Sequence, residues 1–342
     1  METFARFQSK IYLSQNGEHF MKNSAFYYSV GALLYCPANR TSIADSIINE
    51  KFGDKFSLAL CLEDTINDDF VMQAEEIMIQ SLRKIFEGRE KKTFFLPKIF
   101  IRVRNSQQIS RLKKHLGYGM ELITGFIIPK FGPDNADTYI TEMIKANESS
   151  SKKIYMMPIY ENTAVVDLRK RAENLYSLKD RLSRIEDLVL NIRVGGNDLC
   201  HIFGFRRHSN ESIHQIKTIS NIFSDIVTVY GTDYVISGPV WEYYAGDNWK
   251  EGLISELQDD RLCGFTGKTV IHPNQISLVN QAYQVSRKDF DDAQAILNWN
   301  HQNNSFVSGS PSKERMNEYK THTNWAHKIL YLAENFGIKD VH

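Results

Sequence analysis

The chain has 342 residues, of which 42% are hydrophobic and 24% are charged, so it can bury a full core without disulfide support. Forty-one Lys and Arg residues balance forty-one Asp and Glu residues, which excludes a global field that would attract nucleic acid or an anionic membrane. The longest nearly apolar stretch, 25–38, is shorter than the roughly 20 residues that span a bilayer, and no secretory signal is evident. We therefore expect a cytoplasmic protein without a membrane span.

The cysteine pattern is consistent with a cytoplasmic location. Cys36, Cys61, Cys200 and Cys263 are widely spaced, form no C-x-x-C pair and mostly lie beside apolar residues. Such cysteines are typical of buried, reduced thiols, with a zinc site or a disulfide as the alternative.

Residues 1–285 repeat one unit, in which a short apolar run is followed by polar residues and then by a stretch with helical spacing of apolar positions. The predicted strands are 30–35, 56–62, 99–103, 122–128, 153–159, 187–194, 234–236 and 268–271. Helices are predicted between them at 41–49, 69–86, 106–115, 163–184, 211–224, 249–259 and 275–285. Eight such units in about 250 residues predict an α/β protein with a (β/α)8 TIM barrel. An open doubly wound sheet is the alternative.

Residues 286–342 show a different pattern, which predicts a C-terminal helical appendage to the barrel domain of residues 1–285. Helices are expected at 289–300 and 316–336. The segment 302–312 between them is rich in Asn and Ser, which indicates a mobile connection, either a plain linker or the hinge of a lid.

Polar side chains follow most of the predicted strands, at the ends where barrel enzymes place their working residues. In chain order they are Glu63 and Asp64, Arg102 with Arg104 and Asn105, Lys130, Glu161, Asp198, and finally His272 with Gln275. Any one of them could be a solvated loop end. Their recurrence behind consecutive strands favours a functional site at this end of the barrel.

Glu161 and Asp198 form the most specific pair in this set. Two carboxylates at neighbouring strand ends can bind one hard cation and leave positions for water and substrate, which suits Mg2+, with Mn2+ as a substitute. Such a metal could polarise a carbonyl group. The alternative is a surface Glu and an Asp that caps the helix after the sixth strand.

Three arginines are candidates for binding an anion. Arg102 offers a planar donor fork to a substrate carboxylate or oxyanion, and it could also pair with Glu63 or Asp64. Arg206 and Arg207, in the sequence IFGFRRHSN, could bind a phosphate or a second carboxylate, or they could form a solvated basic turn.

Seven motifs occur in an order that resembles a known family. ALLYCPANR, LCLEDT, IRVRN, IIPK, IYENT, GGNDL and GFTGKTVIHPNQI resemble the citrate lyase beta subunit and malyl-CoA lyase family of (β/α)8 carbon–carbon bond lyases, over about residues 29–284. The segment MNEYKTHTNWAHKILYLAENFGI, together with SGPVWEYY, is similar to the branch of that family associated with tellurite-resistance gene clusters.

The resemblance implies roles for individual residues. Glu161 and Asp198 match the Mg2+ carboxylates, and Arg102 matches the arginine that orients the substrate. Glu63 and Asp64 match an acidic pair that supports the metal waters and that arginine. Arg40 and Lys130 match positions of the substrate pocket, with Arg40 near the substrate or CoA entrance.

The resemblance also implies a reaction and an assembly. Relatives cleave or form a bond next to a carbonyl, with the metal holding an enolate. They form trimers or hexamers, and some borrow a catalytic acid from a neighbouring subunit's C-terminal segment. By analogy, Asp289, Asp292 and Glu314 are candidates for that acid here.

The motifs also depart from the family pattern. P-G-x-R-P is replaced by PANRT at 37–41, D-L-E-D by CLED at 61–64 and P-K-x-E by PKFG at 129–132. We expect these changes to alter CoA recognition. Arg104, Arg206 and Arg207 are additional cations, which suggests a phosphorylated or polyanionic metabolite as substrate.

The sequence thus predicts a homo-oligomeric, Mg2+-dependent carbon–carbon lyase, or the reverse condensing enzyme, that acts on a small oxo-acid, an ester or an acyl-CoA-like thioester. One alternative is a thioester hydrolase that uses the same metal site. The other is a non-catalytic metabolite-binding or docking subunit.

Overall fold

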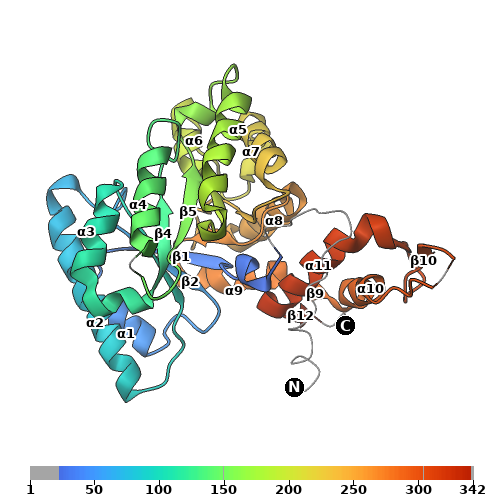
Figure 1. Cartoon of the computed structure of the whole chain (residues 1–342), viewed down its shortest axis with the longest axis horizontal. Helices are drawn as coiled ribbons and strands as arrows, with labels where there is room; N and C mark the ends of the chain where they lie inside the picture. The colour runs from blue at the N-terminus through green and yellow to red at the C-terminus, as the bar shows by residue number, and fades with distance from the viewer. Residues whose placement is uncertain (1–22, 149, 303, 340–342) are drawn as a thin grey trace.

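Eight parallel strands form a barrel in the computed structural model, which describes residues 23–148, 150–302 and 304–339 (Figure 1). Their order in the sheet is β7-β6-β5-β4-β3-β2-β1-β8, and a parallel bridge between Gly238 and Lys268 joins the two end strands. The strands are β1 (Ala32–Pro37), β2 (Ser57–Cys61), β3 (Lys98–Arg102), β4 (Ile123–Ile128), β5 (Tyr155–Tyr160), β6 (Ile192–Val194), β7 (Ile236–Ser237) and β8 (Lys268–Val270). The eight predicted strands are therefore confirmed, and the open-sheet alternative is wrong.

Helices surround this barrel on its outer face (Figure 1). They are α1 (Ile43–Ile48), α2 (Val71–Lys91), α3 (Gln107–Leu116), α4 (Ala136–Glu148), α5 (Arg171–Leu182), α7 (Lys217–Tyr230), α8 (Trp249–Cys263) and α9 (Ile276–Tyr283). The sequence prediction had no helix between the fourth and fifth strands, where α4 lies. A further short helix, α6 (Gly196–Phe203), follows β6 directly and begins at the mouth of the barrel.

Buried side chains fall into an inner and an outer layer because successive residues of a strand point to opposite faces. Leu33 belongs to the cluster inside the barrel, whereas Leu34 belongs to the cluster between strands and helices. The inner cluster comprises Val30, Leu33, Ala59, Phe100, Ile127, Met157, Ile159 and Leu190. This apolar filling closes the barrel below its C-terminal end and leaves polar inward positions near the mouth.

The C-terminal unit lies beside the barrel, at the right of Figure 1. It contains α10 (Arg287–Leu297) and α11 (Tyr319–Phe336), which pack together, and the antiparallel strands β10 (Val307–Gly309) and β11 (Met316–Glu318). The segment 302–312, which is expected to be a mobile connection, contains β10, and its mobility stays a prediction. The division of the chain at residue 285 stays a prediction.

Strand pairing and a side-chain hydrogen bond are among the contacts that attach this unit to the barrel. β12 (Ile338–Lys339) pairs in parallel with β9 (Val285–Ser286), and the Asn335 side-chain amide donates a 2.7 Å hydrogen bond to the Ala25 carbonyl. No helix among the described residues is long and apolar enough to cross a membrane.

A buried charge network joins the outer face of β8 to α8. Lys268 Nζ lies 2.8 Å from Glu256 Oε1 and 2.7 Å from Asp260 Oδ2, and none of the three side chains is exposed. The His214 ring, 2.8 Å from Asp260 Oδ1, brings the loop before α7 into the same network. Burial lowers the pKa of His214, but the hydrogen bond with Asp260 outweighs it and raises the pKa to about 9.

Replacing Lys268 by Met should lower the free energy of unfolding by about 3–5 kcal/mol, because two buried carboxylates would lose the cation that they share and keep only Arg207 and His214 as partners. Lys84→Met is the control, since Lys84 forms an exposed pair with Asp45, and it should cost less than about 1 kcal/mol. Urea denaturation measures both. Equal losses in the two variants would contradict the structural role of Lys268.

Stability should also depend on the protonation of His214. Its pKa in the folded state, about 9, is above the ordinary value of 6.5, so its stabilising contribution is complete below pH 6.5 and disappears as pH rises toward 9. We expect the difference in unfolding free energy between wild type and His214→Gln to fall by about 2–3 kcal/mol over that range. Urea denaturation at several pH values measures this, and a constant difference would contradict it.

Candidate active site

Arg102 is the centre of a cluster of charged residues at the C-terminal mouth of the barrel. It is the last residue of β3, and its side chain is largely buried. Nη2 lies 2.8 Å from Glu63 Oε2, 2.9 Å from Asp64 Oδ2 and 3.1 Å from Glu161 Oε1. One guanidinium nitrogen thus holds carboxylates that follow two different strands, β2 and β5. The predicted ion pairing of Arg102 with Glu63 and Asp64 is present in the structure.

Lys130 adds a second cation to this cluster. Its Nζ lies 2.5 Å from Glu63 Oε1 and 3.0 Å from Asp64 Oδ1, and its backbone N–H donates to Glu161 Oε1 at 2.9 Å. The backbone of Lys130 is left-handed, with φ of 49°, a conformation that costs energy for a residue with a Cβ. The side-chain amide of Asn162 donates to the Lys130 carbonyl at 2.9 Å and helps to hold this turn.

The two acids of the CLED motif differ in acidity. Burial and the hydrogen bond with Asp64 raise the pKa of Glu63 above its usual range. Burial also acts to raise the pKa of Asp64, but the hydrogen bond with Glu63 and the charges of Arg102 and Lys130 lower it to about 2. Asp64 is therefore the more acidic member of the pair, and it carries a negative charge at neutral pH.

Glu161 is the most buried acid of the cluster, with 3% of its surface exposed. Burial raises its pKa to about 8, against the opposing charge of Arg102, and the nearby negative charge of Asp198 acts in the same direction as burial. Oε1 accepts hydrogen bonds from Arg102 and Lys130. Oε2 packs against Gly195, where a Cβ atom would lie only 2.2 Å from it.

Asp198 lies in the first turn of α6, which begins directly after β6. The cap of this helix is Gly195, and no side-chain capping bond is present, so the interpretation of Asp198 as a cap is wrong. Asp198 is half-buried, and its charge acts on Glu161. Two carboxylates that repel each other beside a half-buried position fit a cation between them.

The composition of the cluster suits a metal ion that takes some of its ligands from water or substrate, rather than one enclosed by protein ligands alone. No group of three or more His, Cys, Asp or Glu residues among the described residues could enclose a metal ion. A pair of carboxylates leaves the remaining ligand positions to water or substrate, as Mg2+ usually requires. Glu161 and Asp198 therefore fit Mg2+, and Glu63 and Asp64 are engaged by Arg102 and Lys130 instead.

Three other predicted substrate residues lie outside this cluster. Arg40 is exposed on the loop after β1, where its guanidinium lies 5.9 Å from the centre of the Phe52 ring. Arg206 is also exposed and lies 3.7 Å from Glu242. Arg207 is buried, with Nη2 2.5 Å from the Val240 carbonyl oxygen. The adjacent Arg206 and Arg207 thus have opposite environments.

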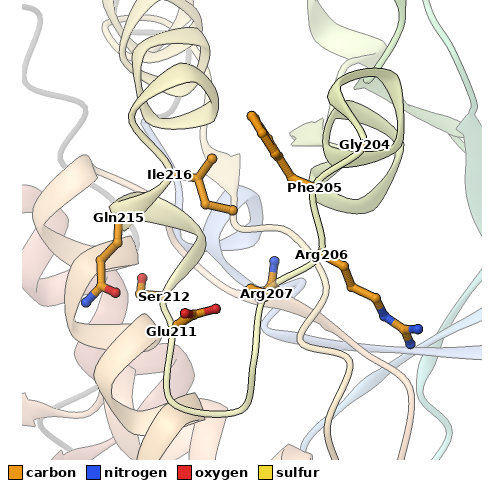
Figure 2. Close-up of a pocket in the computed structure, with 8 residues that line it drawn as sticks. All are labelled: Gly204, Phe205, Arg206, Arg207, Glu211, Ser212, Gln215 and Ile216. Atoms are coloured by element: carbon orange, nitrogen blue, oxygen red, sulfur yellow. The ribbon is translucent and has the colours of Figure 1, made fainter.

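Arg206 and Arg207 line a pocket of about 420 Å³ in the loop after α6 (Figure 2). In the close-up the Arg206 side chain points away from Ser212 and Gln215. Neither Arg102 nor Glu161 lines this pocket. A role for the two arginines in substrate binding stays a prediction.

The acids of the C-terminal unit pair with cations of the same unit. Arg315 Nη2 lies 2.7 Å from Asp289 Oδ1, and its Nε donates to Asp292 at 2.5 Å. Lys288 Nζ lies 2.7 Å from Glu314 Oε1. These pairs stabilise the hairpin against α10. Within the described part of this chain, none of these pairs includes a residue of the mouth cluster.

Gln275 was predicted near the site, but its contacts are structural. Its Nε2 donates to the carbonyl oxygens of Trp241 and Tyr243 at 3.0 and 2.9 Å, and its Oε1 accepts from the backbone of Ile271 and His272. This buried amide joins the loops after β7 and β8. The fixed order H-P-N-Q after a strand is the sequence signal that could have revealed this role, because it forms a capping box.

A parallel barrel with charged residues gathered at its C-terminal mouth is the architecture of a (β/α)8 enzyme. The chain matches, over residues 24–338, the family described as C-C bond lyases of the TIM-barrel fold, and it belongs to that family. It is thus a carbon–carbon lyase, as the sequence predicted. The match includes the C-terminal unit as well as the barrel.

Solved structures share this fold at low sequence identity. CitE from Mycobacterium tuberculosis, in complex with magnesium, acetoacetate and coenzyme A, is 16% identical with a TM-score of 0.55, over 90% of this chain and 99% of that chain. RipC from Yersinia pestis is 15% identical with a TM-score of 0.51, over 75% of this chain and 95% of that chain. A comparison with curated proteins gives no match.

Gly195→Ala should disrupt the cluster, because its Cβ would lie 2.2 Å from Glu161 Oε2 and 2.4 Å from Glu161 Cβ. We expect a loss of about 1–3 kcal/mol in unfolding free energy as Glu161 is displaced. Gly309→Ala is the control, because nothing lies within 4 Å of a Cβ there, and it should change stability by less than about 0.5 kcal/mol. Urea denaturation compares the two, and an unaffected Gly195→Ala variant would contradict the described packing.

Proposed function

We propose that the protein is a Mg2+-dependent carbon–carbon bond lyase, or the reverse condensing enzyme, with a small oxo-acid or its thioester as substrate. The observation that carries the proposal is the charge balance at the mouth. Arg102 and Lys130 contact three carboxylates, Glu63, Asp64 and Glu161, and a fourth, Asp198, lies near Glu161. When all four are ionised, which a bound cation would favour, two positive charges against four negative charges leave an excess of two, the charge of one divalent cation.

Glu161 and Asp198 are the residues that would hold the metal. Glu161 Oε1 is fixed by Arg102 and Lys130, so its orientation is set before any ligand binds. Ligands that are oriented by a surrounding layer of hydrogen bonds bind metals more tightly. Bound Mg2+ would polarise a substrate carbonyl and balance negative charge that develops on its oxygen.

Arg102 supplies hydrogen-bond donors for the substrate. Its Nη2 is engaged by the three carboxylates, whereas its Nε is buried without a partner among the described residues. An unsatisfied buried donor is costly. A substrate oxygen beside Arg102 would satisfy it and would be fixed in position by the same guanidinium that orders the acids.

Lys130 contributes a fixed positive charge. Burial acts to lower its pKa, but the hydrogen bonds to Glu63 and Asp64 outweigh it and raise the pKa above the usual value for lysine. The ammonium group therefore stays protonated near neutral pH and does not act as a base there. We assign it the role of neutralising the acidic pair, so that an anionic substrate can approach the mouth.

The choice of substrate class rests on two lines of support. CitE from M. tuberculosis has the same fold, and its complex contains magnesium, acetoacetate and coenzyme A. The buried Nε–H of Arg102, which has no hydrogen-bond partner among the described residues, can donate to an oxygen of such an acid. The CoA-entrance role of Arg40, the phosphate-binding role of Arg206 and Arg207, trimeric or hexameric assembly and the link to tellurite resistance stay predictions. We also propose a cytoplasmic location, because all four cysteines are free thiols, as in reducing compartments.

Calorimetric titration with Mn2+ tests the proposal. We expect wild type to bind one metal ion and to bind it more tightly in the presence of pyruvate or oxaloacetate. Glu161→Gln and Asp198→Asn should each weaken metal binding at least tenfold, because each removes one of the two charged ligands. Asp187→Asn is the matched control, since Asp187 pairs with Lys153 before β5, at the opposite end of the barrel.

The control variant should bind metal like wild type. No metal binding by a folded wild-type protein, with or without the oxo-acid, would overturn the metal-dependent lyase proposal. Binding that survives in both Glu161→Gln and Asp198→Asn would place the metal elsewhere.

A further inference from the structure

Arg193 is a buried cation inside the barrel that the proposed chemistry does not use. It lies on β6, and only 1% of its surface is exposed. Its Nη2 donates to Thr269 Oγ1 at 2.6 Å, its Nη1 lies 3.4 Å from Asn191 Oδ1, and it also contacts the Tyr35 phenol. All three partners are neutral. No carboxylate of the described residues lies within ion-pair distance of Arg193.

An uncompensated cation in this position is expensive. Burying a charge without a counter-ion costs several kcal/mol in proteins, and a guanidinium cannot lose its proton to avoid that cost. The neighbouring Asn191 side chain also has a buried nitrogen without a partner. Thr269 and Tyr35 stabilise the charge only as neutral acceptors. The arrangement therefore has an unfilled requirement for a negative group.

Arg193 lies below the proposed metal position and is connected to it. Residue 159 of β5 pairs with Arg193, so Glu161 is two residues nearer to the mouth, a distance of about 6.6 Å along a strand. Tyr35 lies beside both Arg102 at the mouth and Arg193 below it. The Arg102 guanidinium lies 6.0 Å from the centre of the Tyr35 ring, and Arg193 contacts the Tyr35 phenol. Arg193 is thus at the floor of the same mouth.

Two of the groups around Arg193 keep some exposed surface. Tyr35 and Thr269 are both only partly buried, whereas Leu33, the β1 residue that pairs with Thr269, is fully buried in the apolar filling of the barrel. Access to Tyr35 and Thr269 therefore comes from the C-terminal side. A ligand that reached Arg193 from the Glu161 side would therefore not cross the apolar core.

We propose that Arg193, with Tyr35 and Thr269, binds a second carboxylate of the substrate, remote from the oxo group, so that the enzyme prefers 2-oxo dicarboxylates to 2-oxo monocarboxylates. The proposal rests on the proposed function, which places the oxo-acid end beside Arg102 and Glu161. The second carboxylate compensates the Arg193 charge through the guanidinium donor fork. Arg193 is then a specificity-determining residue.

Matched pairs of ligands test this inference by calorimetry in the presence of Mn2+. Oxaloacetate is compared with 2-oxobutanoate, and 2-oxoglutarate with 2-oxopentanoate, since each pair has one chain length and differs by one carboxylate. Wild type should bind at least one dicarboxylate about 10- to 100-fold more tightly than its partner, the range expected for a charge-assisted hydrogen bond. Arg193→Met should abolish this preference and leave monocarboxylate affinity within about twofold.

Thermal unfolding separates a binding role from a structural one. Without ligand, Arg193→Met should melt at the same temperature as wild type or higher, because it removes an uncompensated buried charge. Thr269→Val retains the cation but removes one neutral group of the site, so it should reduce the preference less than Arg193→Met does. Should Arg193→Met fail to fold, Arg193→Lys, which lacks the donor fork, should reduce the preference about tenfold.

Each remaining outcome contradicts the inference. Equal affinity of wild type for both members of each pair, or a preference that survives Arg193→Met, overturns the second-carboxylate site alone. If Arg193→Met weakens the binding of monocarboxylates and dicarboxylates equally, Arg193 binds the carboxylate beside the oxo group. That result also overturns the second-carboxylate site. Failure of wild type to bind any oxo-acid with metal overturns the proposed function and the inference with it.

Discussion

The site depends on the guanidinium of Arg102 and its contacts with three carboxylates. Glu63 and Asp64 follow β2, whereas Glu161 follows β5, and Arg102 Nη2 lies within 3.1 Å of an oxygen of each. Without this cation the three acids would repel one another in a partly desolvated position. The contact therefore explains how an acidic cluster can exist at the barrel mouth and why its oxygens have fixed orientations.

Opposite faces of the strands carry two separate charge networks. On the outer face, Lys268 holds Glu256 and Asp260 of α8 with no exposed atoms, and this network fixes the barrel wall. On the inner face, Arg102 and Lys130 partly neutralise the acids at the mouth. In the outer network each carboxylate has two cationic partners, Lys268 and Arg207 for Glu256 and Lys268 and His214 for Asp260, whereas the inner network has excess negative charge near Asp198. That imbalance distinguishes a structural network from one suited to bind ligands.

The strand order and the location of the site could be predicted from the sequence. Apolar runs buried on both faces identify parallel strands, and the C-terminal ends of such strands meet at one end of a barrel. This reasoning placed Glu63, Arg102 and Glu161 at one end, and the structure brings them into contact. It missed α4, although its sequence ADTYITEMIKANE has apolar residues at helical spacing.

The other features of the site depend on three-dimensional contacts that the spacing of residues along the sequence does not reveal. The sequence does not distinguish Arg206 from Arg207, yet one is exposed and the other packs inside the protein. Gly195 is required by the approach of Glu161 from another strand. Arg193 lies within a predicted strand, where its inward direction follows only from the pairing of β5 with β6.

The proposed chemistry requires that Glu161 and Asp198 share one divalent cation whose charge completes the cluster around Arg102. Crystals grown with Mn2+ and pyruvate, measured at a wavelength where manganese scatters anomalously, test this requirement. We expect one strong anomalous peak between the Glu161 and Asp198 carboxylates, with pyruvate oxygen atoms beside it. Ordered pyruvate at the barrel mouth with no anomalous peak between these carboxylates, or a peak held by other residues, would contradict it.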